Sequence, residues 1–113
     1  MKPLLLTGLL IMTSISTVHA GKTALVIHGG AGVMSRQSMS AETETAYQAA
    51  LNKALDAGNA VLQKGGTARE AVIASILVME DSLLFNAGKG AVFNAEGGHE
   101  LDASIMEGHT SKA

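Results

Sequence analysis

The sequence has no cysteine, no tryptophan and a single proline among its 113 residues. The absence of cysteine excludes disulfide frameworks, cysteine-ligated zinc sites and thiol catalysis. Aromatic residues make up only 3% of the chain, so aliphatic side chains must fill any core. The net charge is −2 and no run of lysine or arginine occurs, which argues against a surface that follows nucleic-acid phosphates.

The composition that remains is that of a folded chain. Hydrophobic residues make up 47% and charged residues 16%, and the 13 glycines are spread through apolar segments without a collagen-like period. No internal repeat or low-complexity linker is visible. A core of this size barely offsets the chain entropy that folding removes.

The first part of the chain, residues 1–20, has the layout of a secretory signal peptide. Lys2 supplies a positive end, and residues 4–15 form an apolar stretch. Residues 18–20, Val-His-Ala, place small side chains at the −3 and −1 positions of a cleavage site. The apolar stretch is shorter than the roughly 20 residues that span a bilayer. We therefore expect export to the periplasm or the medium, and a mature segment of residues 21–113.

Two amphipathic helices are expected in the middle of the chain. Ser40 can cap the first, whose apolar residues recur at spacings of three and four up to Leu62, and the Gly65-Gly66 pair ends it. Thr67 and Glu70 form a capping box that opens the second helix. Its apolar face is wide enough to predict packing between two neighbours, and comprises Val72, Ile73, Ile76, Leu77 and Met79.

Three strands are expected around these helices. Residues 23–28 form a continuous apolar run bounded by glycines, which predicts a strand covered on both faces. A short strand at 91–93 is followed by a polar turn at 94–98, and residues 100–106 alternate as a half-buried strand does. The order strand, helix, helix, strand, strand predicts a layered α/β fold. We expect its sheet to be incomplete at Ala113.

Residues 28–30, His-Gly-Gly, follow the first predicted strand. This arrangement resembles the oxyanion-hole loop of esterases and lipases, where backbone N–H groups meet developing negative charge. Such an esterase also needs a Gly-x-Ser-x-Gly sequence, which this chain lacks. On this motif alone, a tight turn after a strand is the more frequent explanation.

Two other motifs fail on inspection. Residues 88–90, Gly-Lys-Gly, suggest a phosphate loop, but Leu83 stands where such a loop has its first glycine. Phe93 occupies the third glycine position of a dinucleotide fingerprint. His99 could begin a zinc-binding helix, yet the residue four positions later is Ala103 rather than a second histidine.

Three segments taken together resemble the plant-type L-asparaginase/isoaspartyl peptidase family of N-terminal nucleophile (Ntn) hydrolases. They are His-Gly-Gly-Ala-Gly at 28–32, Leu-Phe-Asn-Ala-Gly-Lys-Gly-Ala-Val-Phe at 84–93, and Glu-Leu-Asp-Ala-Ser-Ile-Met-Glu-Gly at 100–108. The resemblance covers residues 22–113. Its specificity comes from the order and spacing of the three motifs, since no one of them would suffice.

The resemblance implies a four-layer α-β-β-α sandwich, of which this chain would supply an incomplete portion. It also implies a precursor that cuts itself before a threonine in a Gly-Thr-Val-Gly sequence, giving α and β subunits that assemble as (αβ)2. The freed threonine would hydrolyse L-asparagine and β-aspartyl dipeptides. None of the eight threonines has that context, and Thr110 lies in Gly-His-Thr-Ser. We expect the nucleophile to lie beyond Ala113, and this α-subunit segment to be inactive alone.

Site residues also follow from the resemblance. Asn86 matches an asparagine that orients the nucleophilic threonine, and His28, Gly29 and Gly30 match a loop beside it. From spacing alone, Asn86 and Asp102 are more typical of residues that fix turns. The resemblance implies no required cofactor but a structural sodium ion, held by the backbone carbonyls of Met79, Glu80, Ser82, Phe85, Ala87 and Lys89.

Two alternatives stay open at this point. The chain could be part of an α/β-hydrolase esterase that uses the His28 loop as its oxyanion hole. It could also be a small exported binding module, such as a decayed α subunit that associates with another chain. A downstream Gly-Thr-Val-Gly would favour the amidase, and a downstream Gly-x-Ser-x-Gly the esterase.

Overall fold

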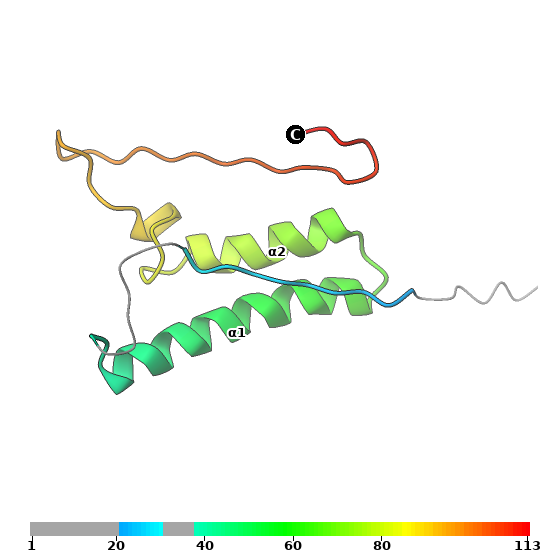
Figure 1. Ribbon diagram of the computed structural model, residues 1–113, viewed down its shortest axis with the longest axis horizontal. Coiled ribbons are helices and arrows are strands. Elements are labelled where there is room, and N and C mark those ends of the chain that lie inside the picture. The colour runs from blue at the N-terminus through cyan, green and yellow to red at the C-terminus, as the bar shows by residue number, and fades with distance from the viewer. Residues whose placement is uncertain (1–20, 31–37) are drawn as a thin grey trace, which may run out of the picture.

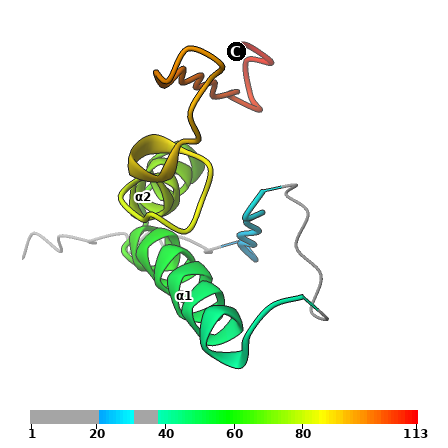
Figure 2. The same cartoon turned by 90° about the vertical axis from the view of Figure 1, so that its left-hand side faces the viewer.

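The computed structural model describes residues 21–30 and 38–113, so the predicted signal peptide lies outside the described residues. Helix α1 spans Ala41–Gln63, helix α2 spans Ala68–Glu80, and a short 3-10 helix, η1, spans Gly88–Gly90. The two long helices run antiparallel, and residues 21–30 pass along one side of the pair (Figure 1). The C-terminal part of the chain passes beyond α2 on another side (Figure 2). Among the described residues, neither helix combines the length and the apolar character needed to cross a bilayer.

The predicted ends of α1 are confirmed. The Ser40 side chain accepts a hydrogen bond from the Thr43 N–H at 3.1 Å, which satisfies one of the free donors of the first turn. At the other end the Gly66 N–H reaches back to the Val61 carbonyl at 2.9 Å, across Gly65 with φ of +79°. This left-handed residue is the Schellman ending that glycine favours.

The capping box of α2 is confirmed as well. The Glu70 N–H donates to the Thr67 hydroxyl at 3.2 Å, and the Glu70 carboxylate accepts from the Thr67 N–H at 2.8 Å. The bond from the Thr67 backbone N–H, together with that from its hydroxyl, lowers the pKa of the Glu70 carboxyl. These local contacts fix where α2 begins, independently of what packs against it.

Small residues form the contact between the two helices. Ala54 and Gly58 of α1 are buried against Ala71 and Ser75 of α2, and the Ser75 hydroxyl donates to the Ala54 carbonyl at 2.9 Å. The predicted packing of α2 between two neighbours is therefore wrong for most of its large side chains. Small side chains form the helix contact, so the large apolar residues of α2 remain at the surface. Four of them are between 41% and 58% exposed, namely Val72, Ile73, Ile76 and Leu77.

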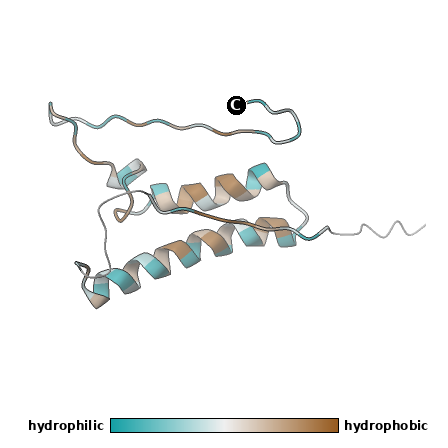
Figure 3. Ribbon diagram, viewed as in Figure 1, coloured by the Kyte–Doolittle hydropathy of each residue, from teal (hydrophilic) through white to brown (hydrophobic). Residues whose placement is uncertain are grey.

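The core lies at the end of the hairpin where α2 leads into the loop after it. Ala54, Met79 and Phe85 are its buried members. Figure 3 shows hydrophobic residues along the middle of both helices and on residues 21–30. Partly buried side chains complete the cluster, namely Ile27, Tyr47, Ala50, Leu51, Val78 and Leu84.

Residues 21–30 are extended, and only one of their two faces is covered. Leu25, Ile27 and Gly29 are partly buried, whereas the residues between them are exposed. Val26 is 88% exposed, although the apolar run predicts a strand covered on both sides. The alternation is that of a strand, and the helix pair covers only the face that carries Leu25 and Ile27.

No β-strand is formed in the described residues, so the predicted strands 23–28, 91–93 and 100–106 are absent there as strands. All three segments are extended but unpaired. A strand needs a neighbouring backbone to accept and donate its ladder hydrogen bonds. The one bridge recorded in this part of the chain joins Glu107 to Lys112. The described residues therefore contain helices alone, and the predicted layered α/β arrangement is not formed among them.

The polar turn at 94–98 does form as predicted. The Asn94 side-chain oxygen accepts from the N–H groups of Glu96 at 3.1 Å and Gly98 at 2.8 Å. Gly97 takes the left-handed conformation, with φ of +81°. This turn reverses the chain before the extended segment that returns past α2 (Figure 1).

Candidate functional site

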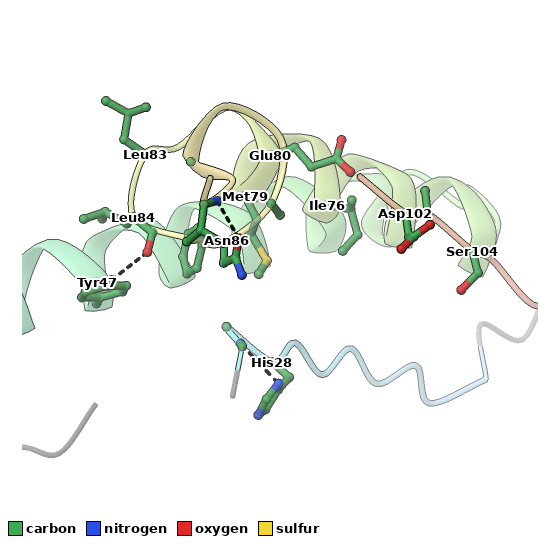
Figure 4. A pocket seen from close by; sticks show the side chains of 17 residues that line it. His28, Tyr47, Ile76, Met79, Glu80, Leu83, Leu84, Asn86, Asp102 and Ser104 are labelled. Atoms are coloured by element: carbon green, nitrogen blue, oxygen red, sulfur yellow. Dashed lines mark hydrogen bonds between the residues drawn. The ribbon is translucent and has the colours of Figure 1, made fainter. Parts of the chain in front are cut away.

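A cleft of about 850 Å³ lies between the extended residues 28–30, the loop that follows α2, and residues 102–104. Tyr47 of α1 and residues in the C-terminal turn of α2 also line it (Figure 4). The cleft therefore brings together parts of all three motifs that the sequence singles out. The other side chains that line it are mostly apolar, including Ile76, Met79, Leu83, Leu84, Phe85 and Val92.

Asn86 presents a hydrogen-bond donor to this cleft. Its side-chain oxygen accepts from the Val92 N–H at 2.9 Å, which fixes the orientation of the amide. The amide nitrogen is therefore directed away from Val92, toward the side of the cleft where His28 lies (Figure 4). A fixed N–H donor at a cleft is suited to hold the oxygen of a bound or reacting group.

His28, Gly29 and Gly30 reach the same cleft from the opposite side. The His28 Nδ1 accepts from the Gly30 N–H at 3.3 Å, so a neutral imidazole carries its proton on Nε2. Gly30 has φ of +115°, a conformation that suits glycine. In this arrangement the Gly30 N–H is not free for an oxyanion. The remaining residues of the motif, Ala31 and Gly32, lie outside the described residues.

Gly29 joins the two halves of the cleft by close packing. A Cβ atom there would lie 3.2 Å from Cε1 of Phe85 and 3.3 Å from Cδ2 of Leu51. Both distances are tighter than an ordinary contact. The absence of a side chain at Gly29 thus lets the first motif settle against the Phe85 ring, one residue from Asn86.

The loop proposed for sodium, residues 79–89, is closed by two glycines. Gly88 has φ of +52° and packs against the Glu80 backbone so closely that a Cβ atom would overlap it. A Cβ atom at Gly90 would overlap the Phe85 carbonyl in the same way. The Lys89 ammonium lies 2.7 Å from the Asp81 carboxylate, and this hydrogen bond lowers the pKa of Asp81. The pair is exposed and contributes little stability.

Several carbonyls of this loop already accept backbone N–H groups. The Met79 carbonyl accepts from Ser82 at 3.1 Å, that of Phe85 from Ala87 at 2.8 Å, and that of Ala87 from Gly90 at 3.1 Å. The Met79 carbonyl also faces the Asp81 N–H, whereas those of Phe85 and Ala87 each have a second lone pair that leaves room for a cation. Carboxylate and imidazole groups do not gather into a three-ligand metal cluster within the described residues. The predicted ligands of a cation in this loop are its main-chain oxygens.

The remaining candidates divide between the cleft and the surface. Asp102 lines the cleft beside Ser104. His99 instead stacks on Phe93, with ring centroids 4.5 Å apart, and its Nδ1 lies 3.2 Å from the Val92 carbonyl. The Thr110 hydroxyl lies near the Glu107 carbonyl at 3.4 Å, in the exposed C-terminal turn. Neither His99 nor Thr110 lines the cleft.

Sequence reasoning missed Tyr47 as a member of this site. In the sequence Tyr47 is one of the apolar residues spaced three and four apart in the first helix, yet its side chain lines the cleft and contacts the loop that carries Asn86. Its rarity was the available signal, since it is the one tyrosine in the sequence. Buried or half-buried tyrosines usually find a partner for the hydroxyl group.

Comparison with known proteins gives a consistent result. Residues 21–113 match the family described as Asparaginase. The isoaspartyl peptidase of Escherichia coli strain K12 is 44% identical over 93 residues, which are 82% of this chain and 29% of that protein. The plant-type L-asparaginase of Pyrobaculum calidifontis is 44% identical over 91 residues, 80% of this chain and 29% of that protein. The isoaspartyl peptidase/L-asparaginase of Xenopus laevis is 41% identical over 87 residues, 77% of this chain and 26% of that protein.

The chain thus spans less than a third of the length of these curated relatives. Within that span the match covers everything after the predicted signal peptide, including the cleft residues from His28 to Ser104. The chain belongs to the asparaginase family of hydrolases, which contains isoaspartyl peptidases and plant-type L-asparaginases and has the Ntn-hydrolase fold.

Proposed function

We propose that this chain is the N-terminal part of the α subunit of a threonine-dependent amidohydrolase. Its substrates are L-asparagine and β-aspartyl dipeptides, and the precursor becomes active by cutting itself. Family membership and the names of the relatives support this assignment over the esterase. The observation that carries it is the meeting of Asn86 with residues 28–30 at one cleft, with the amide nitrogen of Asn86 left as a donor.

In this proposal the nucleophile is the hydroxyl of a threonine freed by self-cleavage, and its own α-amino group is the base. The hydroxyl oxygen attacks the side-chain amide carbon while its proton passes to the amine. The amine then passes this proton to the leaving nitrogen, which departs as ammonia or as the released amino acid and leaves an aspartyl ester on the threonine. Water hydrolyses that ester to release aspartate. Asn86 would hold the hydroxyl oxygen through its N–H, so that attack starts from one fixed position.

For the fold of the whole protein we propose the α-β-β-α sandwich. The helix pair would form an outer helical layer, and residues 23–28 a strand beneath it. The 88% exposure of Val26 supports this, because an apolar side chain on the uncovered face requires a second layer. The partners would be further α-subunit sequence and the β subunit of the same precursor, assembled as (αβ)2.

The function is tested with a chimera in which residues 21–113 replace the matching segment of the Escherichia coli isoaspartyl peptidase. We expect the chimera to cut itself and to release leucine from β-aspartyl-leucine, whereas the 113-residue chain alone releases none. Mass spectrometry of the subunits and a leucine assay are the measurements. An uncut, inactive but folded chimera would contradict the proposal, and so would turnover by the isolated chain. Hydrolysis of p-nitrophenyl acetate by that isolated chain would favour the esterase instead.

Sodium bound by the loop carbonyls is a separate proposal, and the second lone pairs of those oxygens support it. The carbonyls belong to Met79, Glu80, Ser82, Phe85, Ala87 and Lys89. A ligand that binds only the folded state raises the melting temperature as its concentration rises. The Tm of the chimera should therefore increase with sodium chloride but not with choline chloride at equal ionic strength. Equal Tm values in the two salts would rule the site out.

Export is proposed from residues 1–20. When the 113-residue chain is expressed in Escherichia coli, we expect periplasmic protein whose N-terminal sequence begins at Gly21. A control that lacks residues 2–20 should remain in the cytoplasm. Recovery of the full chain, still carrying Met1 and confined to the cytoplasm, would be the opposite result.

A further inference from the structure

The Tyr47 hydroxyl connects α1 to the loop that carries Asn86. It donates to the Leu84 carbonyl at 2.7 Å, across 37 positions of sequence. The bond is partly buried. If the hydroxyl is removed, water can therefore replace it only in part as a donor to the Leu84 carbonyl. Leu84 is two residues before Asn86, and fixing its carbonyl fixes the peptide plane that leads into Phe85.

The Tyr47 ring holds the next residue of the same loop. Its centroid lies 5.8 Å from that of Phe85 at an interplanar angle of 77°, the edge-to-face arrangement that aromatic pairs favour. Phe85 is only 4% exposed, and Gly29 packs against its ring. The ring and the hydroxyl of Tyr47 thus hold two consecutive residues, and Phe85 in turn contacts the His28 motif.

The Asn86 side chain is held by the bond from the Val92 N–H to its oxygen, and the bond from the Ala87 N–H to the Phe85 carbonyl spans its backbone. Because Asn86 itself is exposed, its position depends on the residues at either side. Tyr47 holds the side that precedes it, and Val92 orients the amide. Without the hydroxyl, the Leu84–Phe85 peptide could rotate and carry the Asn86 amide nitrogen out of line.

We propose that Tyr47 is a positioning residue for the amidohydrolase reaction, acting on the nucleophile through Leu84, Phe85 and Asn86. This inference rests on the proposed function. The Tyr47 hydroxyl determines how much of the time the Asn86 N–H points at the threonine oxygen, and so it affects the rate of attack rather than the binding of substrate.

The test is Tyr47→Phe in the chimera, because it removes the hydroxyl and keeps the ring contact with Phe85. We expect kcat for β-aspartyl-leucine to fall about tenfold with KM changed less than twofold, as for the loss of one orienting hydrogen bond. Ser75→Ala is the matched control. It removes a buried hydroxyl that also donates to a backbone carbonyl, but away from the cleft, so it should lower Tm and leave kcat unchanged.

A double substitution separates positioning from general loosening of the structure. If Tyr47 acts through Asn86, then Tyr47→Phe should change kcat less than twofold in a chimera that already carries Asn86→Ala. If the double variant lost kcat by the product of the two single effects, the proposal would be overturned. A Tyr47→Phe variant with unchanged kcat would overturn it as well. An inactive parent chimera would count against the proposed function, and the following measurement would then decide on Tyr47.

Hydrogen exchange of the 113-residue chain reports on the loop without any catalysis. The Val92 N–H donates to the Asn86 side chain at 2.9 Å, so its exchange is expected to depend on how firmly the loop holds that side chain. We expect its exchange, measured by NMR, to be several-fold faster in Tyr47→Phe and unchanged in Ser75→Ala, relative to the amides of α1. Equal Val92 exchange in the original chain and the Tyr47→Phe variant would show that the hydroxyl does not hold the loop.

Discussion

Replacing Asn86 by alanine is expected to lower kcat of the chimera on β-aspartyl-leucine by about 100-fold or more, with little change in KM. Removal of one preorganised donor from an acyl-transfer site has an effect of this order. The alanine lacks both the donor that faces the cleft and the acceptor that holds the Val92 N–H. Steady-state kinetics of the self-cut chimera, corrected for the fraction that has cut itself, are the measurement.

Asn86→Asp separates these two functions of the side chain. An ionised aspartate still accepts from the Val92 N–H, but it offers an oxygen where asparagine offers its N–H donor. We therefore expect Asp to be as inactive as Ala while keeping the Val92 amide protected from exchange. If Asp retained activity close to that of the original chimera, the donor would be irrelevant and the assignment of Asn86 would be wrong.

The helices could be predicted from the sequence because their signals are local. Ser40, the Gly65-Gly66 pair and the Thr67–Glu70 capping box each act within one helical turn, and all of them form as predicted. The polar turn after Asn94 is local in the same sense. Such features depend on neighbours three or four positions away, which a single sequence displays directly.

The strands could not be established in the same way. Alternation at 100–106 and the apolar run at 23–28 do predict extended backbone, and both segments are extended. Whether they pair depends on backbone from elsewhere, which neither pattern specifies. The helix contact was misjudged for a related reason. The large apolar residues of α2 predicted the packed face, whereas close approach requires small ones, and Ala71 and Ser75 are buried instead.

The cleft shows the same division. The resemblance placed Asn86 and residues 28–30 at one site, and the structure places His28 and Asn86, together with Asp102, around one cavity. The contact of Tyr47 with Leu84 could not be predicted, since nothing in the spacing of 37 residues indicates it. The motifs therefore name residues that line the cleft, whereas a residue that holds them in place, such as Tyr47, carries no motif of its own.

Replacing Gly58 by leucine is expected to prevent the chimera from folding to a soluble, self-cutting protein. Even a Cβ atom at Gly58 would overlap the Ser75 hydroxyl and would lie 2.6 Å from the Leu25 side chain and 2.8 Å from the Ala71 carbonyl. The third of these contacts is with backbone, which cannot move without separating the helices. Overpacking by a single side chain typically costs about 1–3 kcal/mol, and leucine adds three carbons beyond the Cβ atom.

Gly58→Ala gives the graded version of this test. Alanine favours the helix over glycine by about 1 kcal/mol, so on propensity alone it would stabilise the protein. We expect the overlap to outweigh that gain and Tm to fall, with part of the loss recovered when Ser75→Ala removes the overlapping hydroxyl. Asn59→Ala, on the exposed side of α1, is the matched control and should keep or raise Tm. A Gly58→Ala chimera as stable as the control would mean that the helices do not meet at Gly58 as closely as the structure places them.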